Sequence, residues 1–186
     1  MSKRVFSLIC AVSCSFIWGT AFVAQDMGMD YIGPYTFSAV RLALGFLTLL
    51  PFFFIFEFKK VKETKLSFKI IIGYLFLLGF FLAGGNIFQQ ISLIYTDVAN
   101  SAVFTVLYVV IVPIIAYFLF SNKIHNSVWP SVLMCLIGGL LLSELNNLRV
   151  RYGDSLVVIG AFFWAFHIVF ISKFLKIFNF PITIAA

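Results

Sequence analysis

The sequence predicts an all-α protein that crosses a membrane several times as a bundle of helices. Of its 186 residues, 62% are hydrophobic and 11% are charged, whereas soluble domains average about 45–50% apolar and about 25% charged residues. The apolar residues gather in long segments separated by short polar breaks, and Phe alone occurs 25 times. A soluble domain of this length cannot bury so much apolar surface, and a disordered chain needs low hydrophobicity. A bilayer is therefore the expected solvent.

Six apolar segments in turn qualify as transmembrane helices, and a seventh begins at Pro181. The first follows Lys3 and Arg4 and is long enough to be a retained span rather than a cleaved signal peptide. Each segment has 16 to 23 residues, which suits a helix that rises about 1.5 Å per residue across the apolar part of a bilayer. The six segments are Val5–Ala24, Pro34–Phe56, Lys69–Ile91, Ala99–Phe120, Val128–Ser143 and Ser155–Leu175.

Basic residues predict the orientation of these spans. Cytoplasmic loops of membrane proteins carry an excess of Lys and Arg, and ten of the 13 basic residues fall on the side of the N-terminus. Arg149 and Arg151 fall on the other side, and Arg41 lies within a span. We therefore expect the N-terminus in the cytoplasm and the spans in a cell membrane, with a bacterial plasma membrane as the expected location. The ten residues are Lys3, Arg4, Lys59, Lys60, Lys62, Lys65, Lys69, Lys123, Lys173 and Lys176.

The Lys-rich loop from Lys59 to Lys69 predicts contact with lipid rather than with nucleic acid. A basic loop on the cytoplasmic side is attracted to anionic headgroups. The net charge of +6 therefore requires no nucleic-acid partner, and none is expected.

Signatures of enzymes and of metal or nucleotide sites are missing from the sequence. It contains no His-Glu-x-x-His zinc motif, no phosphate-binding loop and no Gly-x-Ser-x-Gly nucleophile elbow. No Asp or Glu lies well inside a span. We therefore expect no enzyme activity, no cofactor and no metal. Cys10, Cys14 and Cys135 have no His or carboxylate near them in the sequence, so we expect buried, reduced thiols.

Two distant segments of the chain resemble each other. The stretch from Cys14 to Thr20, which contains Trp18, aligns with the stretch from Gly160 to Phe166 at an offset of 146 residues. Pro34 and Pro181, which open the second and seventh segments, are 147 residues apart. Because five spans per repeat is an odd number, the second copy must enter the membrane from the opposite side. Such inverted repeats are typical of secondary transporters, and we expect the repeats at residues 1–148 and 149–186, the second incomplete.

Several motifs identify a family. The stretch Trp18-Gly19-Thr20-Ala21-Phe22 resembles the end of the first helix in EamA-type members of the drug/metabolite transporter superfamily. The pattern Pro34-x-x-Phe37-x-x-x-Arg41 resembles the start of that family's second helix. Further similar stretches are Tyr95–Ser101 followed by Pro113, Gly138–Leu142, and Gly153–Leu156 followed by Trp164 and Ala165.

This resemblance implies a fold and a function. Family members have ten helices in two five-helix repeats, so the chain supplies the first repeat and the start of the second. The implied function is secondary transport of a small metabolite, amino acid or drug, with a central substrate site and alternating access. A coupling proton or ion is an expected further partner beside the bilayer and the substrate.

Arg41 is the one Lys or Arg that lies away from the ends of a predicted span. It lies about 10 Å into the second segment from the outer side, at a rise of about 1.5 Å per residue. A charge near the bilayer centre costs about 2.5–3.5 kcal/mol on insertion scales. Arg41 is therefore expected either to bind an anionic substrate group or gate a wet cavity, or else to reach the outer surface or pair with a loop acid such as Asp26 or Asp97. Pairing and gating are compatible.

A polar patch interrupts the third segment. Asn86, Gln89 and Gln90 are spaced i, i+3 and i+4, so they share one face of a helix. Side-chain amides are costly in lipid and must face protein or water. The neighbouring Gly84 and Gly85 permit close backbone approach or a local break. The three amides are therefore expected either to contact substrate or to form hydrogen bonds between helices that only pack the bundle.

The fourth segment repeats the polar pattern with Ser101, Thr105 and Tyr108 at i, i+4 and i+7. Tyr108 is a candidate for substrate contact, although Ser and Thr also bond to their own helix backbone. Pro113 in the same segment is expected to bend the helix, because proline removes one helix hydrogen bond.

Trp18 and Trp164 occupy equivalent positions in the two repeats. They are expected either to wall a central pocket or to act as bulky packing residues. His167, one turn beyond Trp164, is the one ionisable side chain inside the sixth segment apart from its Lys173 end. Since histidine titrates at about pH 6.5 in model peptides, His167 is a candidate for a proton relay, with a neutral packing histidine as the alternative.

Two other functions compete with transport. The chain is alternatively a channel or structural membrane subunit built by oligomerisation, for which a homodimer of opposed five-helix units is the expected assembly. The third hypothesis is a membrane enzyme acting on lipids, which needs catalytic groups beyond residue 186.

Overall fold

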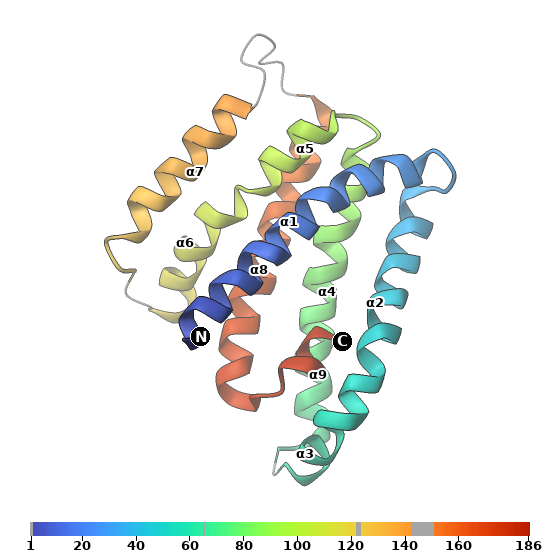
Figure 1. The fold of residues 1–186 in the computed structure, drawn as a ribbon, viewed down its shortest axis with the longest axis vertical. Coiled ribbons are helices and arrows are strands. Elements are labelled where there is room, and N and C mark those ends of the chain that lie inside the picture. The colour runs from blue at the N-terminus through green and yellow to red at the C-terminus, as the bar shows by residue number, and fades with distance from the viewer. Residues whose placement is uncertain (1, 65, 122–123, 143–150) are drawn as a thin grey trace.

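The computed structural model describes residues 2–64, 66–121, 124–142 and 151–186, and every regular element in these ranges is helical (Figure 1). The predicted all-α, polytopic membrane bundle is confirmed, because five stretches are long and apolar enough to cross a membrane. They are Arg4–Met29, Pro34–Phe56, Phe68–Ser92, Val98–Phe120 and Tyr152–Phe178. The helices are α1 (Lys3–Met29), α2 (Pro34–Phe56), α3 (Phe58–Glu63), α4 (Phe68–Ser92), α5 (Val98–Thr105), α6 (Tyr108–Phe120), α7 (Val128–Leu142), α8 (Tyr152–Phe178) and α9 (Pro181–Ala185).

The fifth predicted segment differs from the others in length. It forms α7, an apolar helix of 15 residues, which is shorter than the five long spans. Residue 143, predicted as the last of this segment, lies outside the described residues.

Local sequence signals set the ends of several helices. Pro34 and Pro181 stand in the first turns of α2 and α9, where a proline sacrifices no helix hydrogen bond. Ser2 caps α1, because its Oγ accepts from the backbone nitrogen of Val5 at 3.3 Å. The helix α8 ends at Phe178 and is capped by Asn179, whose φ of 47° is a left-handed conformation that stops a helix.

The burial pattern is the reverse of that in a soluble protein. Phe16, Phe76 and Phe118 are each at least 74% exposed, whereas Gln90 and Ser92 are fully buried. Hydrocarbon solvates an exposed Phe without cost, but it offers no hydrogen-bond partner to an amide. The outer surface therefore suits lipid, and polar side chains are turned inward.

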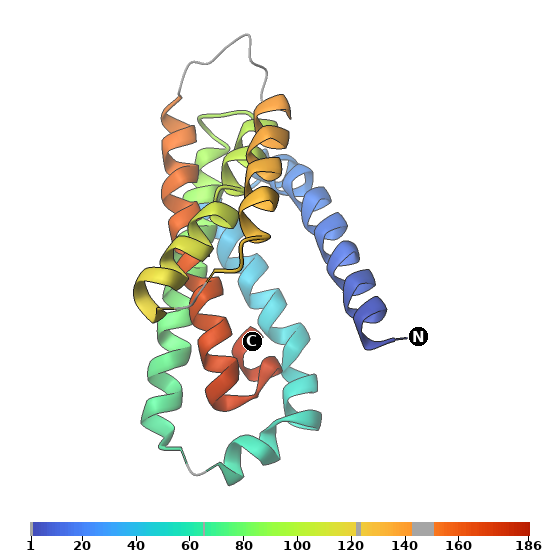
Figure 2. The same cartoon turned by 90° about the vertical axis from the view of Figure 1, so that its left-hand side faces the viewer.

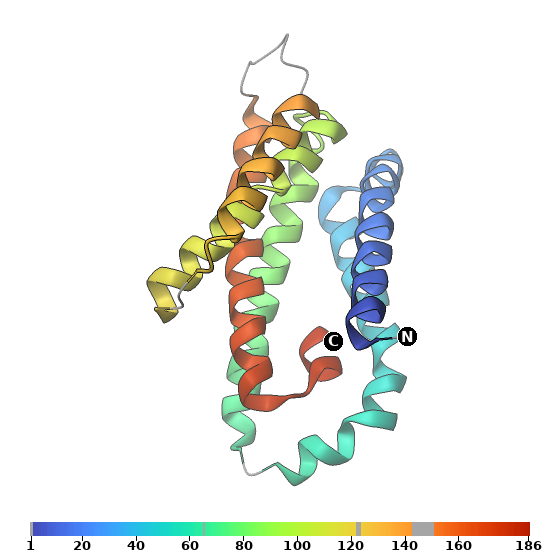
Figure 3. The same ribbon diagram turned by 60° about the vertical axis from the view of Figure 1, so that its left-hand side comes forward.

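The centre of the bundle is the pair formed by α4 and α8, which share the most extensive helix–helix contact and lie side by side in Figures 1 and 3. Val157, Ala161 and Ala165 repeat every four residues on α8 and are almost fully buried. Small side chains of this kind let helix backbones approach closely in membranes. Figures 2 and 3 place α1 and α2 together on one side of this central pair.

The fourth predicted segment breaks earlier than expected. Its break lies at Val106 and Leu107, between α5 and α6, whereas Pro113 lies inside α6. At the break, hydrogen bonds span three residues instead of four, as in the 2.9 Å bond from the backbone nitrogen of Val109 to the carbonyl oxygen of Val106. These tighter turns separate the two helices, and the chain changes direction there (Figure 2).

The first and sixth predicted segments run in opposite directions through the bundle. In Figure 1, α1 rises from the N-terminus and α8 descends toward α9. This is the relation that an inverted repeat requires, and the repeats at residues 1–148 and 149–186 stay a prediction. The boundary between them lies outside the described residues, as do Lys65, Lys123 and Arg149.

The expectation of buried thiols is wrong for two cysteines. Cys10 and Cys14 are exposed free thiols on α1, and Cys135 is half-buried. The cause is that α1 lies at the edge of the bundle, where an apolar side chain meets the surroundings of the protein rather than another helix.

Candidate functional site

Four side-chain amides are buried where the end of α1 meets the end of α4. Gln25 lies on α1, and Asn86, Gln89 and Gln90 lie on α4. Each of the four is at most 1% exposed. We call these four residues the amide group. Their burial agrees with the expectation that the α4 amides avoid lipid.

Two members of the amide group bond to their own helix. The Nε2 atom of Gln25 donates to the carbonyl oxygen of Ala21 at 3.1 Å. The Nδ2 atom of Asn86 donates to the carbonyl oxygen of Leu82 at 2.8 Å. Both side chains are thereby held against the backbone one turn earlier, and their amide oxygens point away from these bonds.

The other two members join helices to one another. Gln89 donates through Nε2 to the hydroxyl of Thr105 at 2.9 Å, which links α4 to the last turn of α5. Gln90 donates through Nε2 to the backbone oxygen of Gln25 at 3.5 Å, a long bond that links α4 to α1. Ser92 and Ser101 add a contact of 3.1 Å between their hydroxyls. The amide group is therefore built into the packing of three helices.

The oxygen atoms of the amide group have no partner. Within the described ranges, no hydrogen-bond donor reaches Oε1 of Gln25, Gln89 or Gln90, or Oδ1 of Asn86. Native proteins satisfy the large majority of buried polar atoms. Among the described residues these four acceptors have no protein donor, so each of them is left for water or for a ligand.

Three aromatic side chains meet beside the amide group, and we call Trp18, Tyr108 and Trp164 the aromatic group. The rings of Trp18 and Tyr108 are stacked with centroids 6.2 Å apart. The rings of Trp18 and Trp164 are tilted with centroids 5.4 Å apart. The Nε1 atom of Trp164 is buried and has no acceptor among the residues that the structure describes. The three side chains bring α1, α6 and α8 together at one point.

Glycines place the aromatic group next to the amide group. A Cβ atom at Gly85, the residue before Asn86, would lie 3.0 Å from Nε1 of Trp164. A Cβ atom at Gly160 would lie 3.3 Å from the backbone oxygen of Gly85. A larger residue at either position would have to displace these neighbouring atoms, so the two glycines favour the close approach of α4 and α8.

His167 is buried against α4. Its Nδ1 atom lies 3.1 Å from the carbonyl oxygen of Leu78, and its ring makes an edge contact with Trp164 at a centroid distance of 6.1 Å. Because a carbonyl oxygen only accepts, Nδ1 carries the hydrogen in this contact. The ring contact places His167 beside the aromatic group. Because Nδ1 faces Leu78, Nε2 is the nitrogen available to another partner.

Arg41 is not joined to these groups by any hydrogen bond or ion pair within the described part of the chain. It is half-buried on α2. Of the two acids named as alternative partners, Asp97 pairs with Arg151 instead, and Asp26 forms no ion pair with Arg41 in the described ranges. A role for Arg41 in binding or gating stays a prediction.

Gln25 is the member of the site that sequence reasoning missed. It lies seven residues after Trp18 on α1, a spacing that returns to the same face of a helix. The signal was therefore present, as a lone amide on the face marked by Trp18, near the end of an apolar segment.

Glu57 was also missed, and it lies at the other end of the bundle. Its carboxylate is 4% exposed and accepts from the backbone nitrogens of Ile182 and Thr183 at 3.0 Å and 2.7 Å. The hydroxyl of Thr183 donates to it at 2.7 Å. Glu57 thereby fastens the start of α9 to the end of α2.

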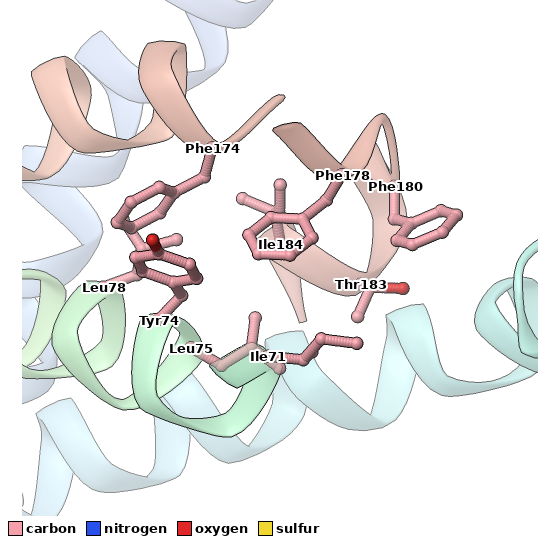
Figure 4. A pocket seen from close by; sticks show the side chains of 9 residues that line it. All are labelled: Ile71, Tyr74, Leu75, Leu78, Phe174, Phe178, Phe180, Thr183 and Ile184. Atoms are coloured by element: carbon pink, nitrogen blue, oxygen red, sulfur yellow. The ribbon is translucent and has the colours of Figure 1, made fainter. Parts of the chain in front are cut away.

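A small hollow between α4, α8 and α9 lies close to this contact (Figure 4). Its volume is about 10 Å³, which is room for about one water. The rings of Tyr74 and Phe174 pack at a centroid distance of 4.2 Å on one side of it. The lining is almost entirely apolar, so this hollow is part of the packing and not a second polar site. It is lined by Ile71, Tyr74, Leu75, Leu78, Phe174, Phe178, Phe180, Thr183 and Ile184.

Comparison with known proteins gives a family and two relatives. The model of the EamA-like transporter family matches residues 5–144. An uncharacterized transporter of Archaeoglobus fulgidus is 28% identical over 177 residues, which cover 95% of this chain and 52% of the relative. The uncharacterized transporter YoaV of Bacillus subtilis is 27% identical over 165 residues, which cover 86% of this chain and 54% of the relative. The chain thus spans about half the length of these curated relatives. No solved structure matches the chain at a significant level.

Proposed function

Because the chain belongs to the EamA-like transporter family, we propose that it moves a small metabolite, amino acid or drug across a membrane as a secondary transporter. The observation that carries this proposal is the amide group, which buries four unpaired oxygens beside the aromatic group. Packing alone gives no reason to leave acceptors unpaired, whereas a substrate site needs polar atoms free to bind.

The depth of the aromatic group supports this function. Trp18, Tyr108 and Trp164 each lie near the middle of a long apolar stretch, Arg4–Met29, Val98–Phe120 and Tyr152–Phe178 respectively. Secondary transporters bind substrate near the bilayer midplane at the interface of their repeats. Trp18 and Trp164 come from the first helices of the two predicted repeats, so their contact supports a substrate site at that interface.

The way the helices pack supports alternating access as the mechanism. The pair α4 and α8 forms a close-packed unit, whereas α1 meets it mainly through Trp18 and the long bond between Gln90 and Gln25. Movement of α1 against this pair opens the site toward one side of the membrane. The contact of Glu57 with α9 closes the opposite end of the bundle.

Orientation and coupling complete the proposal. The proposal puts the N-terminus in the cytoplasm, because the basic residues Lys59, Lys60 and Lys62 follow the end of α2 on the same side as the N-terminus. A cysteine placed at Lys60 should then react with an impermeant thiol reagent only from the inside.

His167 is the residue suited to carry a coupling proton, since its Nε2 atom is not used by the contact with Leu78.

Uptake by purified protein tests the function. Proteoliposomes are incubated with a panel of radiolabelled metabolites, amino acids and drugs, each added outside, and initial rates of uptake are measured against concentration. We expect saturable uptake or exchange of at least one compound, and loss of that activity in a Gln89→Leu, Gln90→Leu double variant. The matched control is Trp129→Phe, on the exposed surface of α7. An absence of saturable movement for every compound would contradict transport.

A further inference from the structure

The orientation of each amide in the amide group is set by its partner. Carbonyl oxygens only accept hydrogen bonds, so the nitrogen and not the oxygen must face Ala21, Leu82 and the backbone of Gln25. A flipped amide at any of these positions would place two acceptors against each other. The unpaired atoms of Gln25, Asn86 and Gln90 are therefore oxygens.

The fourth amide is fixed by a chain of two bonds. The hydroxyl of Thr105 donates its hydrogen to the carbonyl oxygen of Ser101 at 2.7 Å, so toward Gln89 it can only accept. Gln89 must then present Nε2 to Thr105, as it does at 2.9 Å. The free atom of Gln89 is again the oxygen, and all four members of the amide group offer acceptors.

The amide group and the aromatic group carry no formal charge. Neither contains Lys, Arg, Asp or Glu, and their buried unpaired atoms within the described ranges are the four amide oxygens and one donor, Nε1 of Trp164. Oxygen dipoles attract a positive charge and repel a carboxylate, as the carbonyl oxygens of cation channels do. The faces of Trp and Tyr attract cations as well. Trp18 presents its ring between those of Tyr108 and Trp164.

We propose that the substrate of this site is a small organic cation with N–H donors, a protonated amine or a guanidinium compound. Its charged group binds the oxygens of the amide group, and its apolar body lies against the aromatic group. This inference rests on the proposed transport function, and it narrows the substrate class of that site. Under this inference, the charged group of the substrate does not bind Arg41.

Three probes of one shape test the substrate class. They are 2-phenylethylamine, 2-phenylethanol and 3-phenylpropionate, which place a cation, a neutral hydroxyl or an anion on the same ring. Binding to the purified full chain in detergent is measured by equilibrium dialysis. We expect the amine to bind at least about tenfold more tightly than either analogue, since hydrogen bonds to charged groups are about twice as strong as neutral ones. Equal or tighter binding of the alcohol or the carboxylate overturns the inference.

Substitutions at Asn86 test the place of binding. Asn86→Asp turns one amide oxygen into a carboxylate, and we expect it to raise the affinity for the amine by about tenfold. Asn86→Leu removes the oxygen and should lower that affinity by about tenfold. Asn126→Asp is the matched control, because it adds the same charge at an exposed position outside the site. Unchanged amine affinity in Asn86→Asp overturns the inference, and the three-probe series on the unaltered protein does not depend on how the variants fold.

Uptake separates failure of the inference from failure of transport. Saturable uptake of some other compound by protein that neither binds nor moves the amine overturns the substrate class and leaves transport intact. A lack of saturable uptake for every compound counts against transport itself. Uptake of the amine that is inhibited by other organic cations, and not by carboxylates, supports both.

Discussion

Trp18 and Trp164 lie with their ring centroids 5.4 Å apart and their planes tilted by 59°. The two residues hold equivalent positions in the segments that resemble each other in sequence, and they come from α1 and α8. Trp18 is 36% exposed, whereas Trp164 is 8% exposed. Trp164 is therefore buried at the central pair of helices, α4 and α8, and Trp18 is the more accessible of the two tryptophans.

Truncation of Trp18 should weaken transport more than it weakens the fold. Trp18→Ala removes a ring that contacts Tyr108 and Trp164, and a lost cation–π contact is worth about 0.5–2 kcal/mol. We expect kcat/KM for uptake to fall by about tenfold, while the melting temperature in detergent changes little. Initial-rate uptake in proteoliposomes measures this. Trp129→Ala is the control on the outer surface of α7, and an equal loss of uptake there would argue against a special role for Trp18.

The hydrogen bond between Gln89 and Thr105 should matter for stability. Thr105 is 4% exposed, and Thr105→Val would keep its shape while leaving Nε2 of Gln89 without an acceptor. An unpaired buried donor costs about 1–3 kcal/mol, and each kcal/mol lowers the melting temperature by about 2–4 °C in a chain of this size. Size-exclusion chromatography after heating measures the change. Thr105→Ser keeps the hydroxyl and should lose much less, so similar losses in both variants would count against this explanation.

Much of the framework could be predicted because apolar runs and prolines are local signals. The second segment was predicted as Pro34–Phe56, and α2 has the same bounds. The spacing of Asn86, Gln89 and Gln90 predicted one shared face, and all three are buried together. These features depend on helix periodicity and on the free-energy cost of placing amides in lipid. Both effects can be judged from short stretches of sequence.

Features that depend on distant partners could not be predicted. Gln25 belongs to the amide group only because the end of α1 meets α4, as its backbone contact with Gln90 records. The burial of Glu57 depends on α9, which follows it by more than a hundred residues. The break at Val106 lies between α5 and α6, which both pack against α8, whereas Pro113, the residue expected to bend the segment, lies inside α6.

Asp154 and Asp97 should differ sharply in their effect on stability. The carboxylate of Asp154 is 3% exposed, and it accepts from the hydroxyl of Thr96 and, at 2.8 Å, from the backbone nitrogen of Arg151. Asp154→Asn replaces one accepting oxygen by a donor and should cost about 1.5–3 kcal/mol. The side chain of Asp97 is 67% exposed in its pair with Arg151, so Asp97→Asn should cost less than about 1 kcal/mol. Unfolding in mixed micelles with rising SDS measures both, and equal losses would show that burial does not decide the effect.

Gly153 should be the least replaceable glycine at the start of α8. A Cβ atom there would lie 2.8 Å from the backbone oxygen of Ser92 and 2.8 Å from the backbone nitrogen of Thr96. Backbone atoms cannot rotate away as a side chain can, so Gly153→Ala must push α8 from the end of α4, at a cost of about 1–3 kcal/mol for overpacking. Gly79→Ala is the matched control on α4, because no atom lies within 4 Å of its Cβ position, and alanine there favours the helix by up to about 1 kcal/mol. Melting temperatures in detergent should therefore fall for Gly153→Ala and stay level or rise for Gly79→Ala. The reverse order would mean that α8 can shift without strain, and that the contact at Gly153 does not hold the two helices in place.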